Sequence, residues 1–160
     1  EQPCATIGEL AELRARLRGA TRIAADESVR KVEDPMAVVY AGAADVLVLK
    51  AQPLGGIQSA LGITREAKLP VTVSSALETS VGISMGLHLA AALEVESFDA
   101  GLGTVALLAE DVCDEPFIAE NAMLYVNRAV PSELQLAKLA ADSERTHWWH
   151  ERLKRCFNLV

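Results

Sequence analysis

The sequence has few cysteines, no long apolar run and no excess of basic residues, and each lack excludes a class of protein. Cys4, Cys113 and Cys156 are far apart and odd in number, which excludes a disulfide framework and a clustered zinc site and favours a reducing compartment. No run approaches the roughly 18 to 20 apolar residues of a membrane span. With 15 basic and 22 acidic residues the net charge is −7, which argues against a nucleic-acid partner.

The first residues also lack an initiator methionine and a signal-peptide pattern. The chain starts with Glu1, and no basic segment followed by an apolar one comes after it. We therefore expect a cytoplasmic protein without a membrane partner. The missing methionine indicates either that a segment was removed or that this chain is a portion of a longer protein.

What the chain does contain is an alternation of short apolar runs with helical patterns. Apolar residues make up 51% of the sequence, enough for a sizeable core. The pattern predicts strands at 22–25, 45–49 and 70–73, with a weaker one at 98–102. It predicts helices that start at Thr6, Asp34, Ile57 and Thr79 or Ser80. The first of these starts with a capping box formed by Thr6 and Glu9. Strands that alternate with helices indicate βαβ units and a parallel sheet.

Polar residues and glycines stand at the predicted ends of these strands, at intervals of 24 to 27 residues. They are Glu1, Asp26, Lys50, Ser74 with Ser75, and Gly101 with Gly103. In a (β/α)8 barrel the strand ends share one mouth, where such residues are typical of an active site. Two carboxylates beside a lysine suit a hard divalent cation with a general acid or base next to it.

Each of these residues also has a purely structural interpretation. Asp26 precedes Glu27 and can cap a helix, and Lys50 can extend its ammonium group to solvent. The serines and glycines can be ordinary turn residues. The regular spacing favours a shared site over these separate explanations.

These motifs resemble the barrel half of the enolase superfamily, muconate-lactonising subgroup, and within it the actinobacterial o-succinylbenzoate synthase family. The resemblance rests on 1–3, 26–28, 49–56, 73–82 and 100–104, and it covers nearly the whole chain. It implies an α/β fold that is the C-terminal part, about strands 4–8, of an enolase-superfamily (β/α)8 barrel without its capping domain and first strands. Residues 1–130 would form this partial barrel, and a C-terminal helical segment at 131–160 would pack on it.

The resemblance also implies a role for each strand-end residue. Glu1 and Asp26 match two carboxylate ligands of Mg2+, and Lys50 matches a catalytic lysine beside the substrate. Ser74, Ser75, Gly101 and Gly103 fall where the family binds a small-molecule carboxylate substrate. The implied reaction is dehydration that forms o-succinylbenzoate, a menaquinone precursor.

Two parts of the family's site have no match in this chain. They are the Lys-x-Lys of the second strand and the first metal ligand, an Asp on the third strand. We therefore expect the chain by itself to be inactive, with its own missing N-terminal half or a homo-oligomer as partner.

Other interpretations stay open at this level. The same scaffold serves N-acylamino-acid racemases and dipeptide epimerases, and a non-catalytic half-barrel is a further alternative. His147 and His150 are spaced as a metal pair on a helix but have no third ligand in register. The acidic segment 110–115 is expected to be a solvated loop.

Overall fold

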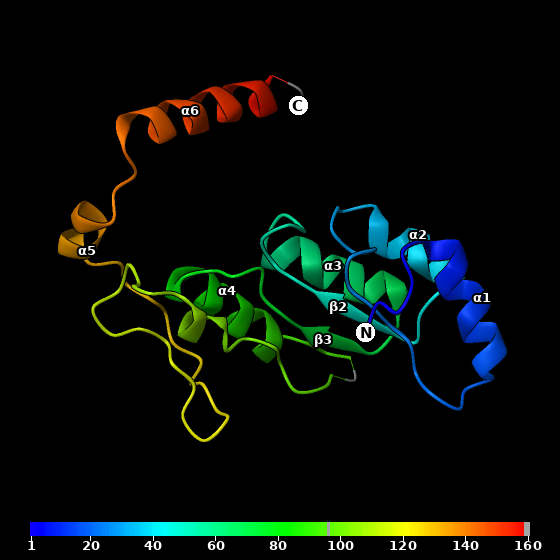
Figure 1. Cartoon of the computed structure of the whole chain (residues 1–160). Coiled ribbons are helices and arrows are strands. Elements are labelled where there is room, and N and C mark those ends of the chain that lie inside the picture. Colours follow the sequence, from blue (N-terminus) through cyan, green and yellow to red (C-terminus); the bar gives the residue numbers. More distant parts are fainter. Residues whose placement is uncertain (96, 159–160) are drawn as a thin grey trace.

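The computed structural model describes residues 1–95 and 97–158, and it consists of a small sheet, the helices around it and a C-terminal extension (Figure 1). The elements in chain order are α1 (Ile7–Leu17), β1 (Ala24–Ala25), α2 (Asp34–Tyr40), β2 (Val46–Leu49), α3 (Ile57–Ala67), β3 (Val71–Val73), α4 (Ser80–Ala91), the 3-10 helix η1 (Thr104–Leu107), α5 (Glu133–Lys138) and α6 (Ser143–Phe157).

The sheet is parallel, with the strands in the order β1-β2-β3. Ala25 pairs with Leu47, and Leu49 pairs with Val73. Because α2 lies between β1 and β2 in sequence and α3 between β2 and β3, each crossover is a βαβ unit. The parallel arrangement and the places of the strands predicted at 22–25, 45–49 and 70–73 are confirmed, but each strand is shorter than predicted.

The fourth predicted strand, at 98–102, does not form among the described residues, so this prediction is wrong. The chain there touches the sheet only through two isolated parallel bridges, from Val71 to Ser97 and from Ser74 to Gly101. Asp99 and Gly101 are poor strand formers, so the segment follows the edge of β3 without forming a ladder.

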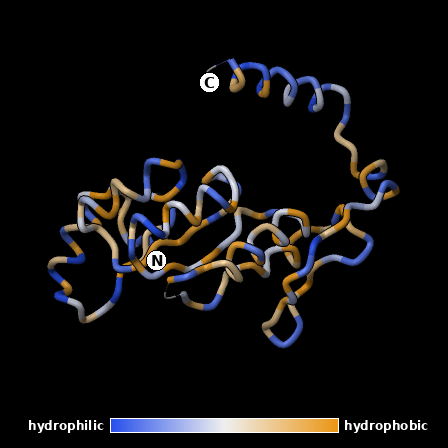
Figure 2. Tube along the Cα trace, turned by 180° about the vertical axis from the view of Figure 1, so that it is seen from behind, coloured by the Kyte–Doolittle hydropathy of each residue, from blue (hydrophilic) through white to orange (hydrophobic). Residues whose placement is uncertain are grey.

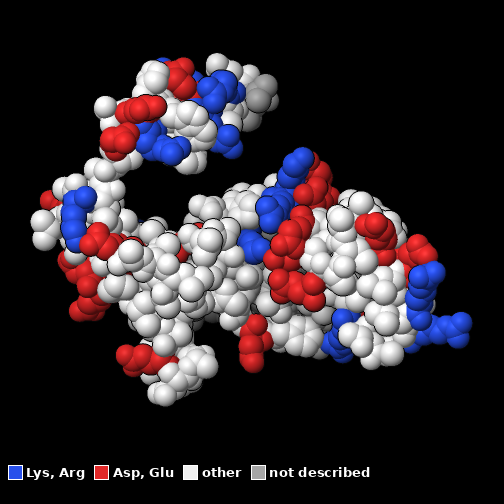
Figure 3. Space-filling view, viewed as in Figure 1, with Lys and Arg blue, Asp and Glu red and all other residues white. Residues whose placement is uncertain are grey.

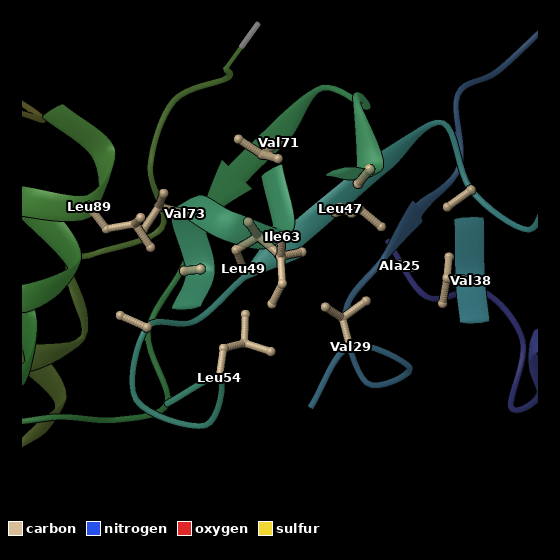
Figure 4. Close-up of a cluster of buried hydrophobic side chains, with 14 of the residues drawn as sticks. Ala25, Val29, Val38, Leu47, Leu49, Leu54, Ile63, Val71, Val73 and Leu89 are labelled. Atoms are coloured by element: carbon tan, nitrogen blue, oxygen red, sulfur yellow. The ribbon is translucent and has the colours of Figure 1, made fainter. Parts of the chain in front are cut away.

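Side chains alternate between the two faces of the sheet, and one face forms the core. Leu47, Leu49, Val71 and Val73 are all at most 1% exposed and pack with Ile63 of α3 in one apolar cluster (Figure 4). Burial of each such side chain contributes roughly 1.5–3 kcal/mol. The opposite face carries the intervening residues of each strand, and it leads to the candidate site.

The N-terminal helix α1 begins with the predicted capping box. The Thr6 hydroxyl accepts a hydrogen bond from the Glu9 N–H at 3.2 Å, and the Glu9 carboxylate accepts one from the Thr6 N–H at 2.9 Å. The Thr6 hydroxyl also donates to the Glu9 carboxylate at 2.8 Å, and this bond, followed by the one from the Thr6 N–H, lowers the pKa of Glu9. Two otherwise unpaired N–H groups at the helix start are thereby satisfied.

An ion pair fastens α1 to the amino-terminal side of the sheet. Arg14 Nε lies 2.7 Å from Asp45 Oδ1, and Asp45 Oδ2 accepts the Ile23 N–H at 2.9 Å. Burial acts to raise the pKa of Asp45, but the bonds from Ile23 and Arg14 outweigh it and the pKa is lowered. The carboxylate thus links α1, the start of β1 and the start of β2.

The acidic segment 110–115 is not wholly the solvated loop that its composition predicts. Asp111 is 6% exposed, and its carboxylate accepts hydrogen bonds from both the N–H and the hydroxyl of Ser80. The Ser80 hydroxyl in turn accepts the Phe117 N–H at 2.8 Å. A carboxylate at the start of α4 is stabilised by the free N–H groups and the dipole of that helix. This contact holds the segment after η1 against α4.

The C-terminal helices differ from the expected packing on the barrel. Two helices, α5 and α6, form in this segment, but α6 has no buried residue and lies apart from the sheet (Figure 1). Trp148 and Trp149 are 44% and 54% exposed. The backbone trace of α6 is mostly hydrophilic (Figure 2), and acidic and basic side chains stand next to one another on it (Figure 3). No helix within the described ranges is long and apolar enough to cross a membrane.

We expect Asp45→Asn to lower stability at neutral pH by about 1 kcal/mol, the usual upper range for a partly exposed pair. The folded pKa of Asp45 lies below its ordinary value of 3.8, so the contribution is present above that value and is lost as pH falls through the folded pKa. Thermal unfolding followed by circular dichroism between pH 3 and 7 measures it. The exposed Asp99→Asn is the control, and equal pH profiles for the two variants would contradict the assignment.

Candidate active site

The carboxyl ends of the three strands meet at one edge of the sheet and carry Asp26, Lys50 and Ser74. The register sets Asp26 beside Val48 and sets Lys50 beside Ser74. Because side chains two residues apart share a face, all three side chains stand on the face opposite the helix-covered core. In a closed barrel this is the inner face.

Asp26 and Lys50 form an ion pair between the Lys50 Nζ and the Asp26 Oδ1. The side chains are 13% exposed for Lys50 and 8% for Asp26. A lysine this deeply placed needs a partner, since an isolated buried charge is costly. Lys50 therefore does not extend to solvent, and Asp26 caps none of the described helices, because the residue before α2 is Glu33. Both purely structural interpretations are wrong.

Glu1 occupies an exposed position, and no described hydrogen bond or ion pair joins its carboxylate to Asp26 or Lys50. Its neighbour Gln2 makes the connection instead, because the Gln2 N–H donates to the Ala24 carbonyl at 2.8 Å and its side chain accepts the Asp26 N–H at 2.9 Å. The segment 1–3 thus follows β1 as a preceding strand end would. Gln2 was missed in the sequence, where its only signal is its place next to Glu1.

Ser74 and Gly101 are brought together by the bridge between β3 and the segment that follows α4. The Gly101 N–H donates to the Val73 carbonyl at 2.8 Å. A Cβ on Gly101 would lie 3.1 Å from the Ser74 Oγ, which is tighter than ordinary contact. The register then places Lys50, Ser74 and Gly101 in one row across three neighbouring segments.

Ser75 is held within the protein more firmly than its neighbours. It is 9% exposed, and its hydroxyl lies 2.7 Å from the Thr104 hydroxyl and donates to the Gly101 carbonyl at 3.3 Å. Thr104, at the start of η1, is a second residue that sequence reasoning did not select. The pair fastens the end of β3 to the loop that carries the glycines.

Gly103 is exposed and lies apart from the charged pair. It lines a cavity of about 490 Å3 together with Leu87, Asp99 and Tyr125 among others, and this cavity includes neither Asp26 nor Lys50. The structure therefore groups Asp26, Lys50, Ser74 and Gly101 at the sheet edge and leaves Gly103 to the side.

The carboxylate oxygens available near this edge are of the chemical type that binds a magnesium ion. Glu1 and Asp26 offer carboxylate oxygens, which are the ligands that Mg2+ prefers, and Mg2+ requires an octahedral set of oxygens. Within the described ranges no three His, Cys, Asp or Glu side chains come together. The carboxylate of Asp26 therefore fits Mg2+ in its donor atoms, while the exposed Glu1 carboxylate makes no described contact with it.

A parallel sheet covered by helices, with an acid–lysine pair at its strand ends, is the arrangement of a β/α-barrel segment. The particular family follows from a comparison of the sequence with known families. Residues 1–130 match the model of the enolase C-terminal domain-like family, and the chain belongs to that family. The resemblance and the fold class expected from the motifs are confirmed.

Individual relatives agree with this assignment. The chain is 51% identical over 160 residues to proteins named o-succinylbenzoate synthase from Mycobacterium marinum and Mycobacterium tuberculosis. The match covers 100% of this chain and 48% of each relative, so the chain spans about half the length of the curated relatives it matches.

Solved structures give the same picture of the fold. A muconate lactonizing enzyme from Pseudomonas putida superposes with a TM-score of 0.73 at 27% identity, covering 88% of this chain and 41% of that one. The Pseudomonas fluorescens enzyme in complex with muconolactone gives 0.75 at 28% identity, covering 86% and 39%.

We expect Thr104→Val to destabilise the protein by about 1 kcal/mol, because it leaves the buried Ser75 hydroxyl without its shorter hydrogen bond. Thr104→Ser keeps the hydroxyl and serves as the matched control. Chemical denaturation of the two variants measures the difference, and equal midpoints would show that the Ser75–Thr104 contact adds nothing.

Proposed function

We propose that the protein to which this chain belongs is a Mg2+-dependent o-succinylbenzoate synthase, a carbon–oxygen lyase of menaquinone biosynthesis in the cytoplasm. The observation that carries the proposal is the buried Asp26–Lys50 pair at the ends of adjacent parallel strands. It stands in a chain that is 51% identical along its whole length to proteins of that name.

The proposed reaction removes water from 2-succinyl-6-hydroxy-2,4-cyclohexadiene-1-carboxylate. A base takes the proton from the ring carbon that bears the carboxylate, and the electron pair of that C–H bond forms a new ring double bond. The neighbouring C–O bond breaks, the hydroxyl group leaves with a proton as water, and the ring becomes aromatic. No oxidant or reductant is needed, so the residues have only to transfer protons and to stabilise the negative charge that develops on the substrate.

Glu1 and Asp26 would hold the metal through their carboxylates. When bound, Mg2+ supplies concentrated positive charge close to the substrate carboxylate, where negative charge grows as the proton leaves. Asp26 is suited to this because β1 ends directly before it and its side chain is nearly buried. Its position is therefore set by the sheet and not by a mobile loop.

Lys50 would place its ammonium group beside the reacting carbon. The Asp26 carboxylate holds it on the inner face, and low exposure keeps water from screening its charge. In this position it stabilises the negative charge that develops when the α-proton is removed. The base itself would come from the part of the protein that matches the other half of the relatives.

Ser74 and Gly101 would line the substrate's place next to Lys50, since the register sets the three in one row. Ser75 would act through its contact with Thr104, which fixes the loop that bears Gly101 and Gly103. The substrate is a dianion, and the half-buried Ser74 hydroxyl can donate a hydrogen bond to its succinyl carboxylate, while Gly101 adds no side chain to fill this place. The remaining half of the barrel, or a second copy, is the expected protein partner.

Replacement of Lys50 tests the catalytic assignment. We expect Lys50→Ala to lower kcat by about 10²- to 10⁴-fold, the usual contribution of a positioned acid–base or charge-stabilising group. Product formation is measured by the absorbance of the aromatic ring, and the exposed Lys31→Ala is the control. Near-normal turnover would remove Lys50 from the reaction. Racemisation of acylamino acids by the parent without dehydration would overturn the proposed activity.

Replacement of Asp26 tests the metal assignment. Asp26→Asn keeps the shape of the side chain but removes the charge, so we expect the Mg2+ concentration needed for half-maximal activity to rise at least about tenfold. Asp99→Asn, away from the pair, controls for the overall loss of one negative charge. A magnesium titration equal to that of the parent would exclude Asp26 as a ligand.

A further inference from the structure

The side chain of Gln2 makes four hydrogen bonds around the turn that carries Asp26. Its Oε1 accepts the N–H of Asp26 at 2.9 Å and the N–H of Ser28 at 3.3 Å. Its Nε2 donates to the Ser28 hydroxyl and to the Cys4 carbonyl, both at 2.9 Å. One amide group therefore binds both sides of the turn that carries Asp26.

This turn is fixed at its two ends but depends on Gln2 in its middle. The Val29 N–H donates to the Asp26 carbonyl at 2.8 Å, which closes the turn. Ala25 and Val29, on either side of it, are buried in the apolar cluster (Figure 4). The N–H groups of Asp26 and Ser28 find their described partner in the Gln2 side chain, so the orientation of the Asp26 backbone follows that of Gln2.

The backbone of Gln2 is held as firmly as its side chain. Its N–H donates to the Ala24 carbonyl at 2.8 Å. Its φ of 33° lies in the left-handed region, which a residue with a side chain keeps only when its surroundings impose it. The peptide that joins Glu1 to Gln2 is therefore set in a defined direction next to Asp26.

We infer that Gln2 is a positioning residue that fixes the placement of the Glu1 and Asp26 carboxylates relative to one another and thereby sets the affinity for Mg2+. The inference rests on the proposed function, because that function assigns both carboxylates to the metal. Gln2 itself does not bind the ion; its amide has four protein partners. Groups that orient metal ligands in this way typically change metal affinity by about 10- to 100-fold when they are replaced.

The test compares Gln2→Met with its parent in the protein expressed from its own gene. Methionine has the length of glutamine but forms none of the four hydrogen bonds. Isothermal calorimetry with MgCl2, in the absence of substrate, measures metal affinity directly. We expect the dissociation constant to rise about 10- to 100-fold. Gln135→Met, at a similarly half-buried glutamine of α5, is the matched control and is expected to bind Mg2+ as the parent does.

A second variant covers the case in which Gln2→Met does not fold. Ser28→Ala removes one of the four bonds and keeps the two that Gln2 accepts from backbone N–H groups. We expect it to weaken Mg2+ binding about threefold, the effect of one hydrogen bond. Parent-like Mg2+ affinity in Ser28→Ala would overturn the inference in that case.

The outcomes separate this inference from the proposed reaction. A folded Gln2→Met that melts at a lower temperature but binds Mg2+ like the parent has lost only stability, and the inference is then overturned. A parent that binds no Mg2+ overturns it as well. A parent that binds Mg2+ but does not dehydrate the substrate contradicts the proposed function, while weaker binding by Gln2→Met would still support the positioning role.

Discussion

The parallel pairing of β1, β2 and β3 places the end of every strand at the same edge of the sheet. Parallel strands cannot be joined by tight turns, so each connection is a crossover with a helix, and those helices cover one face. Leu47, Leu49 and Val73 fill that face, which leaves the opposite one to Asp26, Lys50 and Ser74. The apolar core and the polar site are thus two results of one alternation along the same strands.

A contribution to stability does not by itself account for the Asp26–Lys50 pair. Bringing two charges out of water costs several kcal/mol per ion in practice, and their attraction roughly compensates for this. Apolar residues of similar volume would serve the fold equally well at such a place. What they would not provide is a cation and an anion held in contact on the inner face, at the point where neighbouring strands end.

Much of this arrangement could be predicted from the sequence, because it follows from local patterns. The run from Ile57 to Ala67 has the period of a helix, and the apolar runs before Asp26, Lys50 and Ser74 have the length of buried strands. Contacts between distant residues have no such pattern. Gln2 meets Asp26 across 24 residues, Ser75 meets Thr104 across 29 and Ser80 meets Asp111 across 31, so these partners emerged only from the fold. Residues Ser143–Phe157 form the helix α6, but their sequence does not specify which surface that helix contacts.

The exposed position of α6 has a spectroscopic consequence. The chain contains two tryptophans, Trp148 and Trp149, and both are on this helix, with their rings 4.8 Å apart and almost perpendicular. Arg152 lies within 6 Å of each ring, 5.7 Å from Trp148 and 5.9 Å from Trp149. Intrinsic fluorescence of this chain therefore reports on the surroundings of α6 and is nearly blind to the sheet and its charged edge. A shift of the emission to shorter wavelength would record the covering of α6, independently of any change at Asp26 or Lys50.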